Sequence, residues 1–222
     1  MAVTQEGKGL QSGLASVAPV MEPAIEAGAG IAVVVLTILG LADVSPGALA
    51  AIATIVIGAG LLMQVADAGT EYARLTAKSD AAPLTGVMFG GGATVGFLAG
   101  GVGIVLGILA LLGVNAAHLT PAALIVFGGA LLLSAGVSAE MNKARIHASS
   151  ESAAARAMAE QAATAAAGAQ ALIGLAAIIL GILALVPTHA TILLLVGLLA
   201  VGASLLLTAA ATAGAAMGEL AA

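Results

Sequence analysis

Long apolar runs separated by polar breaks set the pattern of this chain. Each run approaches or exceeds the roughly 18–20 apolar residues that a helix needs to cross a bilayer. In lipid the backbone must satisfy its own hydrogen bonds, so the pattern predicts transmembrane helices. The six runs cover residues 27–42, 47–66, 92–114, 121–139, 167–186 and 191–212.

The breaks alternate between short and long. The short ones read "ADVSPG", "NAAHLT" and "PTHA", and the long joints cover residues 65–91 and 140–166. We therefore expect an all-α integral membrane protein with six transmembrane helices in three tandem hairpins. In this prediction an N-terminal arm, residues 1–26, precedes a single membrane domain whose hairpins are 27–66, 92–139 and 167–212.

The three hairpins resemble one another in sequence. Their first helices align as "IAVVVLTILGL" from Ile31, "IVLGILALLGV" from Ile104 and "IILGILALVPT" from Ile178. Their second helices align as "IGAGLLM" from Ile57, "FGGALLL" from Phe127 and "VGASLLL" from Val201. The recurrence indicates an internal repeat and a pseudo-three-fold bundle. The alternative is that Leu/Ala/Gly-rich membrane helices look alike by composition.

The long joints also contain helix-forming sequence. "MQVADAGTEYARLTAKSD" is expected to extend the second span, and "SESAAARAMAEQAATAAAGAQALIGL" to lead as a helix into the fifth. Pro83 and the triplet Gly90-Gly91-Gly92 predict breaks before the third span.

Composition supports a membrane location. The chain of 222 residues is 61% hydrophobic and 8% charged, whereas a soluble domain has about 25% charged residues. A net charge of −5 with six basic residues argues against a nucleic-acid partner. The chain has no cysteine, which excludes a disulfide, a thiolate metal site and a cysteine nucleophile.

The basic residues predict the orientation. All six lie in the N-terminal arm or in the long joints: Lys8, Arg74, Lys78, Lys143, Arg145 and Arg156. By the positive-inside rule, both termini and the joints face the cytoplasm, and we expect a multi-pass protein of the cell (inner) membrane.

Glycines in the third span indicate close helix packing. Their spacing places them on one stripe: Gly92, Gly96, Gly100, Gly103 and Gly107. Small residues let membrane helices approach closely, so the stripe predicts a seam, either within one chain or between subunits. Only three Phe, one Tyr and no Trp occur, although aromatic residues usually mark the membrane interfaces. We therefore expect contact with further subunits, identical or different, besides the lipid bilayer.

Two groups of residues could ligate a metal. Asp43, His118 and His189 lie in the short breaks at similar places in the hairpins, and such side chains suit zinc or copper. The alternative is that polar residues in turns face water. On the cytoplasmic rim, acids gather beside methionines and could hold iron or manganese, or simply solvate helix ends. The rim residues are Glu22, Glu26, Asp67, Glu71, Glu140 and His147.

No cofactor is assigned, because the sequence contains no nucleotide or flavin motif. "GGGATVGFLAGG" lacks a preceding strand and the lysine of a phosphate-binding loop. The apolar spans, free of acids and of lysine or arginine, favour a non-catalytic membrane protein that acts as a self-assembling scaffold or as a small subunit of a larger complex. The alternative is a channel or transporter for a small solute or metal ion, with the acidic, Met-rich rim at its cytoplasmic mouth. A membrane enzyme is a third possibility.

Overall fold

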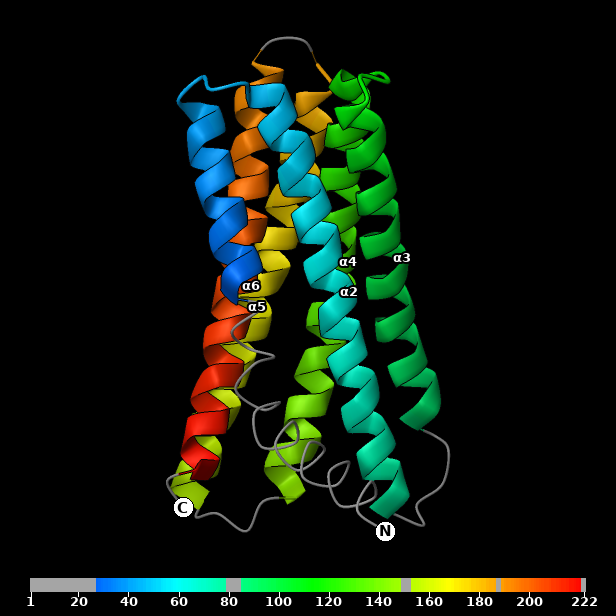
Figure 1. Cartoon of the computed structure of the whole chain (residues 1–222). Helices are drawn as coiled ribbons and strands as arrows, with labels where there is room; N and C mark the ends of the chain where they lie inside the picture. Colours follow the sequence, from blue (N-terminus) through cyan, green and yellow to red (C-terminus); the bar gives the residue numbers. More distant parts are fainter. Residues whose placement is uncertain (1–26, 79–84, 149–152, 187–188, 221–222) are drawn as a thin grey trace, which may run out of the picture.

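The fold is a bundle of long helices. A computed structural model describes residues 27–78, 85–148, 153–186 and 189–220, and all its regular elements are helices. They run side by side along one axis (Figure 1). The helices are Ala27–Leu41, α2 (Pro46–Lys78), α3 (Thr85–Leu111), α4 (Ala116–Ala148), α5 (Ala153–Ala184) and α6 (Ala190–Leu220).

Five of these helices are long and apolar enough to cross a membrane, and the first helix, Ala27–Leu41, is shorter. The prediction of a multi-pass helical membrane protein is therefore confirmed. The spanning segments are Pro46–Val65, Thr94–Leu111, Ala116–Gly136, Thr164–Ala184 and Ala190–Ala210. The helices α2 and α5 are longer than their candidate spans and include residues of the long joints.

Two predicted boundaries are wrong. The triplet Gly90–Gly92 does not break the chain, because α3 already begins at Thr85 and runs through it. The fourth span does not begin at Pro121: α4 begins at Ala116 and contains this proline. Proline lacks the N–H that would bond the carbonyl four residues earlier, here Ala117. Residue 117 lies in the exposed first turn, where solvent can satisfy that carbonyl.

The bundle has an inner and an outer set of helices. The inner helices α2, α4 and α6 contact one another, while α3 packs between α2 and α4, and α5 between α4 and α6. In the spanning segments, 44%, 50% and 44% of residues are buried on α2, α4 and α6, against 28% and 17% on α3 and α5. Most exposed large side chains of the outer helices are apolar, as expected for a surface that faces lipid.

The core is apolar, and its hydroxyl groups are satisfied locally. Thr37, Thr54 and Thr120 are almost fully buried, and each donates a hydrogen bond of 2.8 Å to the carbonyl four residues earlier on its own helix. Such bonds let a polar side chain lie among apolar neighbours without an unpaired donor. One cluster of buried side chains joins all three inner helices. Its members include Ile57 on α2, Phe127 on α4 and Val201 on α6.

Two of the turns at one end of the bundle, which we call the turn end, share one geometry. At the end of the first helix and of α3, Asp43 (φ 65°) and Gly113 (φ 80°) are left-handed, and each N–H bonds the carbonyl three residues earlier. The following N–H groups, of Val44 and Val114, bond the carbonyls of Leu39 and Leu109. This arrangement is the Schellman motif that commonly ends helices.

The residues that begin the inner helices share a geometry as well. Ser45, Asn115 and His189 are left-handed, and each carbonyl accepts the N–H of the residue four positions later. Ser45 and Asn115 are 70 residues apart, and Asn115 and His189 are 74 apart. Buried positions recur at the same two offsets, as at Val33, Gly103 and Ala177. At these offsets Val34, not Ile31, aligns with Ile104, three residues from the alignment that the sequence suggests.

Candidate functional site

The glycine stripe of α3 lies against the inner helices of the same chain. A methyl group built on Gly100 would lie 2.7 Å from the carbonyl oxygen of Gly58 on α2, and one built on Gly58 would lie 2.7 Å from the carbonyl oxygen of Gly100. Gly96 and Gly107 also face α2, at Val65 and Ile55, respectively. Contacts this close hold backbones together where lipid provides no hydrophobic drive between helices.

The other two members of the stripe differ from these. Gly103 faces the ring of Phe127 on α4, and the backbone of Gly58 on α2 lies farther away, at 3.6 Å from an added methyl group. Gly92 lies on α3 in a part where the structure describes the backbone only. The described part of the stripe thus packs against α2 and α4 within one chain.

A second glycine contact joins α4 to α5. A methyl group on Gly128 would lie 2.5 Å from the carbonyl oxygen of Gly174, and one on Gly174 would lie 2.7 Å from that of Gly128. At the corresponding position of α6, a methyl group on Gly202 would lie 2.5 Å from the Val33 side chain on the first helix. Each inner helix therefore packs closely on another helix through a glycine: α2 on α3, α4 on α5, and α6 on Ala27–Leu41.

The structure does not bring the outer candidate residues together as one metal-binding group. The described residues contain no group of three His, Asp or Glu side chains that could hold a metal ion, so Asp43, His118 and His189 do not form one. All three are exposed. His118 and His189 also do not correspond to each other, because His189 takes the left-handed position of Asn115. The ring nitrogen Nδ1 of His118 lies 2.9 Å from Oδ1 of Asn115, which ties it to the start of its own helix.

The rim hypothesis falls largely outside the described part of the chain. Glu22 and Glu26 are not among the described residues. For the remaining rim residues the structure gives only the helix: Asp67 and Glu71 lie on α2, and Glu140 and His147 on α4. The rim metal site stays a prediction.

A polar contact between helices was missed in the sequence. Nε2 of Gln170 on α5 donates a hydrogen bond of 3.2 Å to Oγ of Ser134 on α4, and Oγ of Ser134 in turn donates to the carbonyl of Leu131 at 3.1 Å. The corresponding residues of α2 and α6 are Gln64 and Thr208, so all three inner helices are polar here. The signal was available, since the aligned segments "GLLM", "ALLL" and "SLLL" are each followed by a polar residue.

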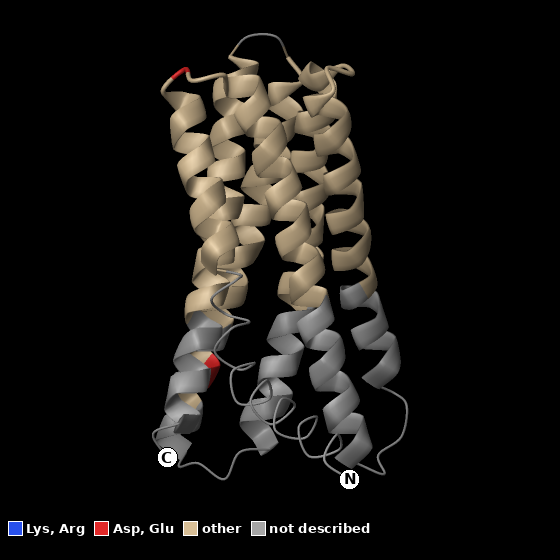
Figure 2. Cartoon of the chain, viewed as in Figure 1, with Lys and Arg blue, Asp and Glu red and all other residues tan. Residues whose placement is uncertain are grey.

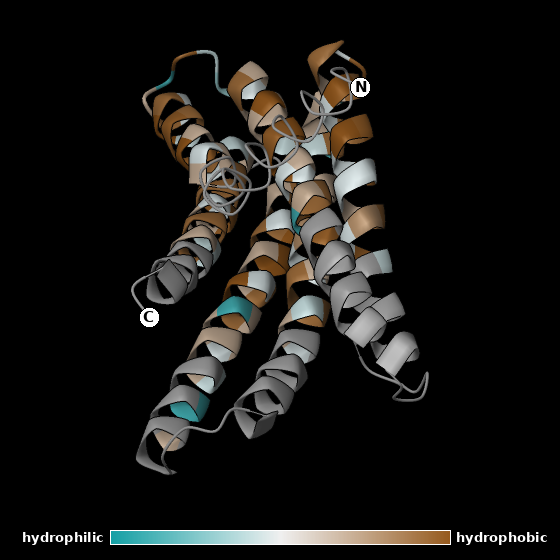
Figure 3. Ribbon diagram, turned by 60° about the horizontal axis from the view of Figure 1, so that its bottom comes forward, coloured by the Kyte–Doolittle hydropathy of each residue, from teal (hydrophilic) through white to brown (hydrophobic). Residues whose placement is uncertain are grey.

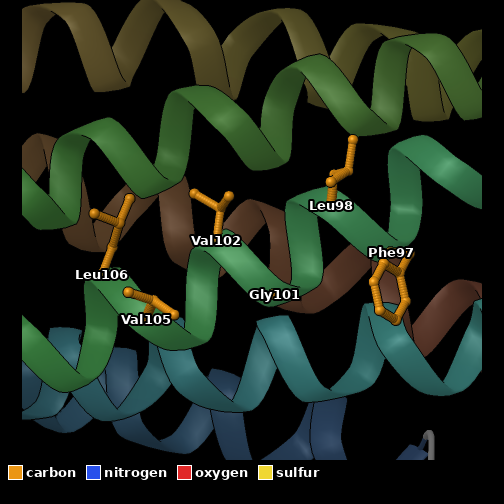
Figure 4. Close-up of a pocket in the computed structure, with 6 residues that line it drawn as sticks. All are labelled: Phe97, Leu98, Gly101, Val102, Val105 and Leu106. Atoms are coloured by element: carbon orange, nitrogen blue, oxygen red, sulfur yellow. The ribbon is translucent and has the colours of Figure 1, made fainter.

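A shallow groove of about 310 Å³ lies on the outer surface of α3 (Figure 4). Its lining is wholly apolar and surrounds Gly101, where an added methyl group would meet nothing within 4 Å. The groove lies within the candidate spanning segment Thr94–Leu111. Its other lining residues are Phe97, Leu98, Val102, Val105 and Leu106.

Charged residues are rare in the part of the chain whose side chains the structure describes. Figure 2 shows acidic residues at the turn end and low on a helix, and the other residues that it does not draw in grey are uncharged. Asp43 lies in a turn, and Glu160 lies on α5 before its spanning segment. No family model, curated protein or solved structure matches this sequence.

Proposed function

We propose that this chain is a non-catalytic multi-pass membrane protein that acts as a scaffold, or as a small subunit of a membrane complex. The observation that carries this proposal is the filled middle of the bundle. Ile57, Phe127 and Val201, one on each inner helix, are fully buried in a single apolar cluster. A solid apolar layer at this depth favours a structural role over an open conduit for a polar solute.

The outer surface supports assembly with further subunits. In the view with the end opposite the turns tilted forward, hydrophobic residues recur along the described helices (Figure 3). The whole chain has four aromatic residues, so the aromatic belts that normally anchor a lipid-facing protein are nearly missing. We infer that part of this surface contacts copies of the chain or other membrane proteins, and that lipid covers the rest.

We also propose that the bundle consists of three copies of one hairpin arranged around a pseudo-three-fold axis. The offsets of 70 and 74 residues support this, because they relate turn conformations, buried positions and glycine contacts alike. The second helix of each hairpin packs on the first helix of the next, and α6 packs on Ala27–Leu41. The contacts thereby form a closed ring of three.

We infer that the joints and both termini face the cytoplasm of a cell (inner) membrane, as the basic residues suggest. The absence of cysteine makes the test direct. A cysteine in place of exposed Asp43 should react with an impermeant thiol reagent from outside the cell, whereas one in place of Lys78 should react only after the membrane is opened. The reverse pattern would invert the orientation.

Particle size tests the assembly proposal. The chain has a mass of 21.0 kDa. If it assembles with itself, light scattering of the purified protein in nanodiscs should give a protein mass of at least twice this value. If it is a subunit of a larger complex, a second protein should copurify with it in a constant ratio. A monodisperse 21.0 kDa particle would contradict assembly. The matched control is the same measurement after reconstitution at a lower ratio of protein to nanodiscs, because a specific assembly keeps its stoichiometry while monomers that share a disc by chance separate.

A channel or transporter for a small solute is the second candidate. It is favoured by one observation, the polar residue that recurs on all three inner helices near one end of their spans. Proteoliposomes should then show flux of a small solute or metal ion that empty liposomes lack. Flux by a monomeric particle would replace the scaffold proposal with this one. The acidic, Met-rich rim would then be its entry site.

A further inference from the structure

Three polar side chains lie at one depth in the bundle. Gln64 lies 18 residues after Pro46, Ser134 lies 18 after Ala116, and Thr208 lies 18 after Ala190, the first residues of their helices. At about 1.5 Å per residue, each is about 27 Å from the turn end. With Gln170, which hydrogen-bonds Ser134, we call these residues the polar layer.

The position of these residues near the ends of their spans, where hydrocarbon gives way to lipid headgroups, does not explain the polar layer. One residue before each polar position, the exposed face carries Met63, Leu133 and Leu207, which are 45%, 59% and 63% exposed. Gln64, Ser134 and Thr208 are only partly exposed. At the same depth, the lipid-facing side of each inner helix is therefore apolar and the side turned toward the bundle is polar. A simple transition from hydrocarbon to headgroups would make both sides polar.

The hydrogen bonds leave capacity for water in this layer. An amide side chain can make four hydrogen bonds. Within the part of the chain that the structure describes, Gln170 makes one, to Ser134, so its other donor and its carbonyl oxygen can bond to water. Burying such groups dry would cost a few kcal/mol, and intramembrane polar residues commonly face a wet interior.

An apolar layer closes the bundle next to the polar layer, on the side toward the turn end. Leu61, Leu131 and Leu205 lie three residues before the polar positions, on the same side of their helices. They are 5%, 3% and 1% exposed and belong to the core cluster. We propose that water enters the bundle from the end opposite the turns as far as the polar layer and stops at these leucines.

Cysteine accessibility tests this inference, which does not depend on whether the chain assembles. The chain has no native cysteine, so each variant carries a single thiol. The variants are Ser134→Cys in the polar layer, Leu133→Cys on the lipid face at the same depth, and Leu131→Cys in the layer above. The reagent is a charged methanethiosulfonate applied to membrane vesicles of either orientation.

Only an ionised thiol in contact with water reacts, so we expect Ser134→Cys to be labelled about tenfold faster than both controls, from the side opposite the turns. Equal rates at residues 133 and 134 would overturn the proposal, because the depth alone would then explain the reactivity. Rapid labelling at residue 131 would overturn the leucine closure. Thr208→Cys with Leu207→Cys as its control repeats the comparison on α6, should the α4 variants fail to accumulate.

Discussion

The aromatic ring of Phe127 on α4 occupies the space that a side chain at Gly103 on α3 would need. The corresponding residues of the first hairpin are Ile57 and Val33, and those of the third are Val201 and Ala177; all four are fully buried. Phe127, the largest of the three inner residues, is thus opposite the smallest counterpart, Gly103. In a closely packed interior the ring leaves no room for a larger residue at position 103.

The first prediction concerns this pair. Gly103→Ala should lower stability by about 1–3 kcal/mol, because the added methyl group overlaps the Phe127 ring. Combining it with Phe127→Val reproduces the pair of the third hairpin and should recover part of that loss. Thermal unfolding followed by far-ultraviolet circular dichroism is the suitable measurement, since the chain has no Trp and a single Tyr. A double variant less stable than Gly103→Ala would refute the volume argument.

The second prediction concerns backbone contact. Gly128→Ala should destabilise the bundle by about 3 kcal/mol, the upper end of overpacking costs, because its methyl group meets a backbone oxygen that cannot move aside. Gly129→Ala is the matched control, since an added methyl group at this adjacent position meets nothing within 4 Å. Equal melting temperatures for the two variants would show that α4 and α5 do not approach as closely as described.

The third prediction concerns the first turn. Asp43 is left-handed in the Schellman position that Gly113 occupies in the second hairpin. A side chain there costs about 1 kcal/mol or more, somewhat less for Asp, so Asp43→Gly should stabilise the protein by about 0.5–1 kcal/mol. Gly113→Ala should destabilise it by a similar amount. Both changes are read from the shift in melting temperature, and a loss of stability in Asp43→Gly would contradict the turn geometry.

The fourth prediction concerns the hydrogen bond between Gln170 and Ser134. Bonds of this kind between membrane helices contribute about 0.6 kcal/mol on average, so the two residues should be coupled weakly. A double-mutant cycle with Gln170→Leu and Ser134→Ala measures the coupling free energy directly. A value above about 2 kcal/mol would mean that the bond is dry and would speak against water in the polar layer.

How far the sequence allowed these features to be predicted varies with the kind of signal. Apolar length predicted the spans well, because a bilayer demands it regardless of neighbouring helices. Boundaries set by Gly90–Gly92 and Pro121 failed, since a helix in a bundle tolerates residues that would end it in water. The turn residue His189 was matched with His118 by residue type, whereas its backbone conformation pairs it with Asn115.

The contacts of the glycines could not be derived from spacing alone. The stripe predicted that something approaches α3 closely, but Gly103 meets an aromatic ring and Gly100 a backbone, and only the three-dimensional arrangement distinguishes them. The polar layer was missed because each of its residues is an ordinary uncharged side chain. Its meaning comes from the equal depth of Gln64, Ser134 and Thr208.

The packing of α6 on the first helix has a consequence for chain connectivity. A methyl group on Gly40 would lie 2.9 Å from Leu195, and one on Gly30 would lie 2.7 Å from Leu206, so the first and the last of the described helices are immediate neighbours in space. The order in which the hairpins are linked is then not essential to their contacts. A circularly permuted gene, opened between α4 and α5 and joined from the old end to the old beginning by a flexible peptide, should yield the same bundle.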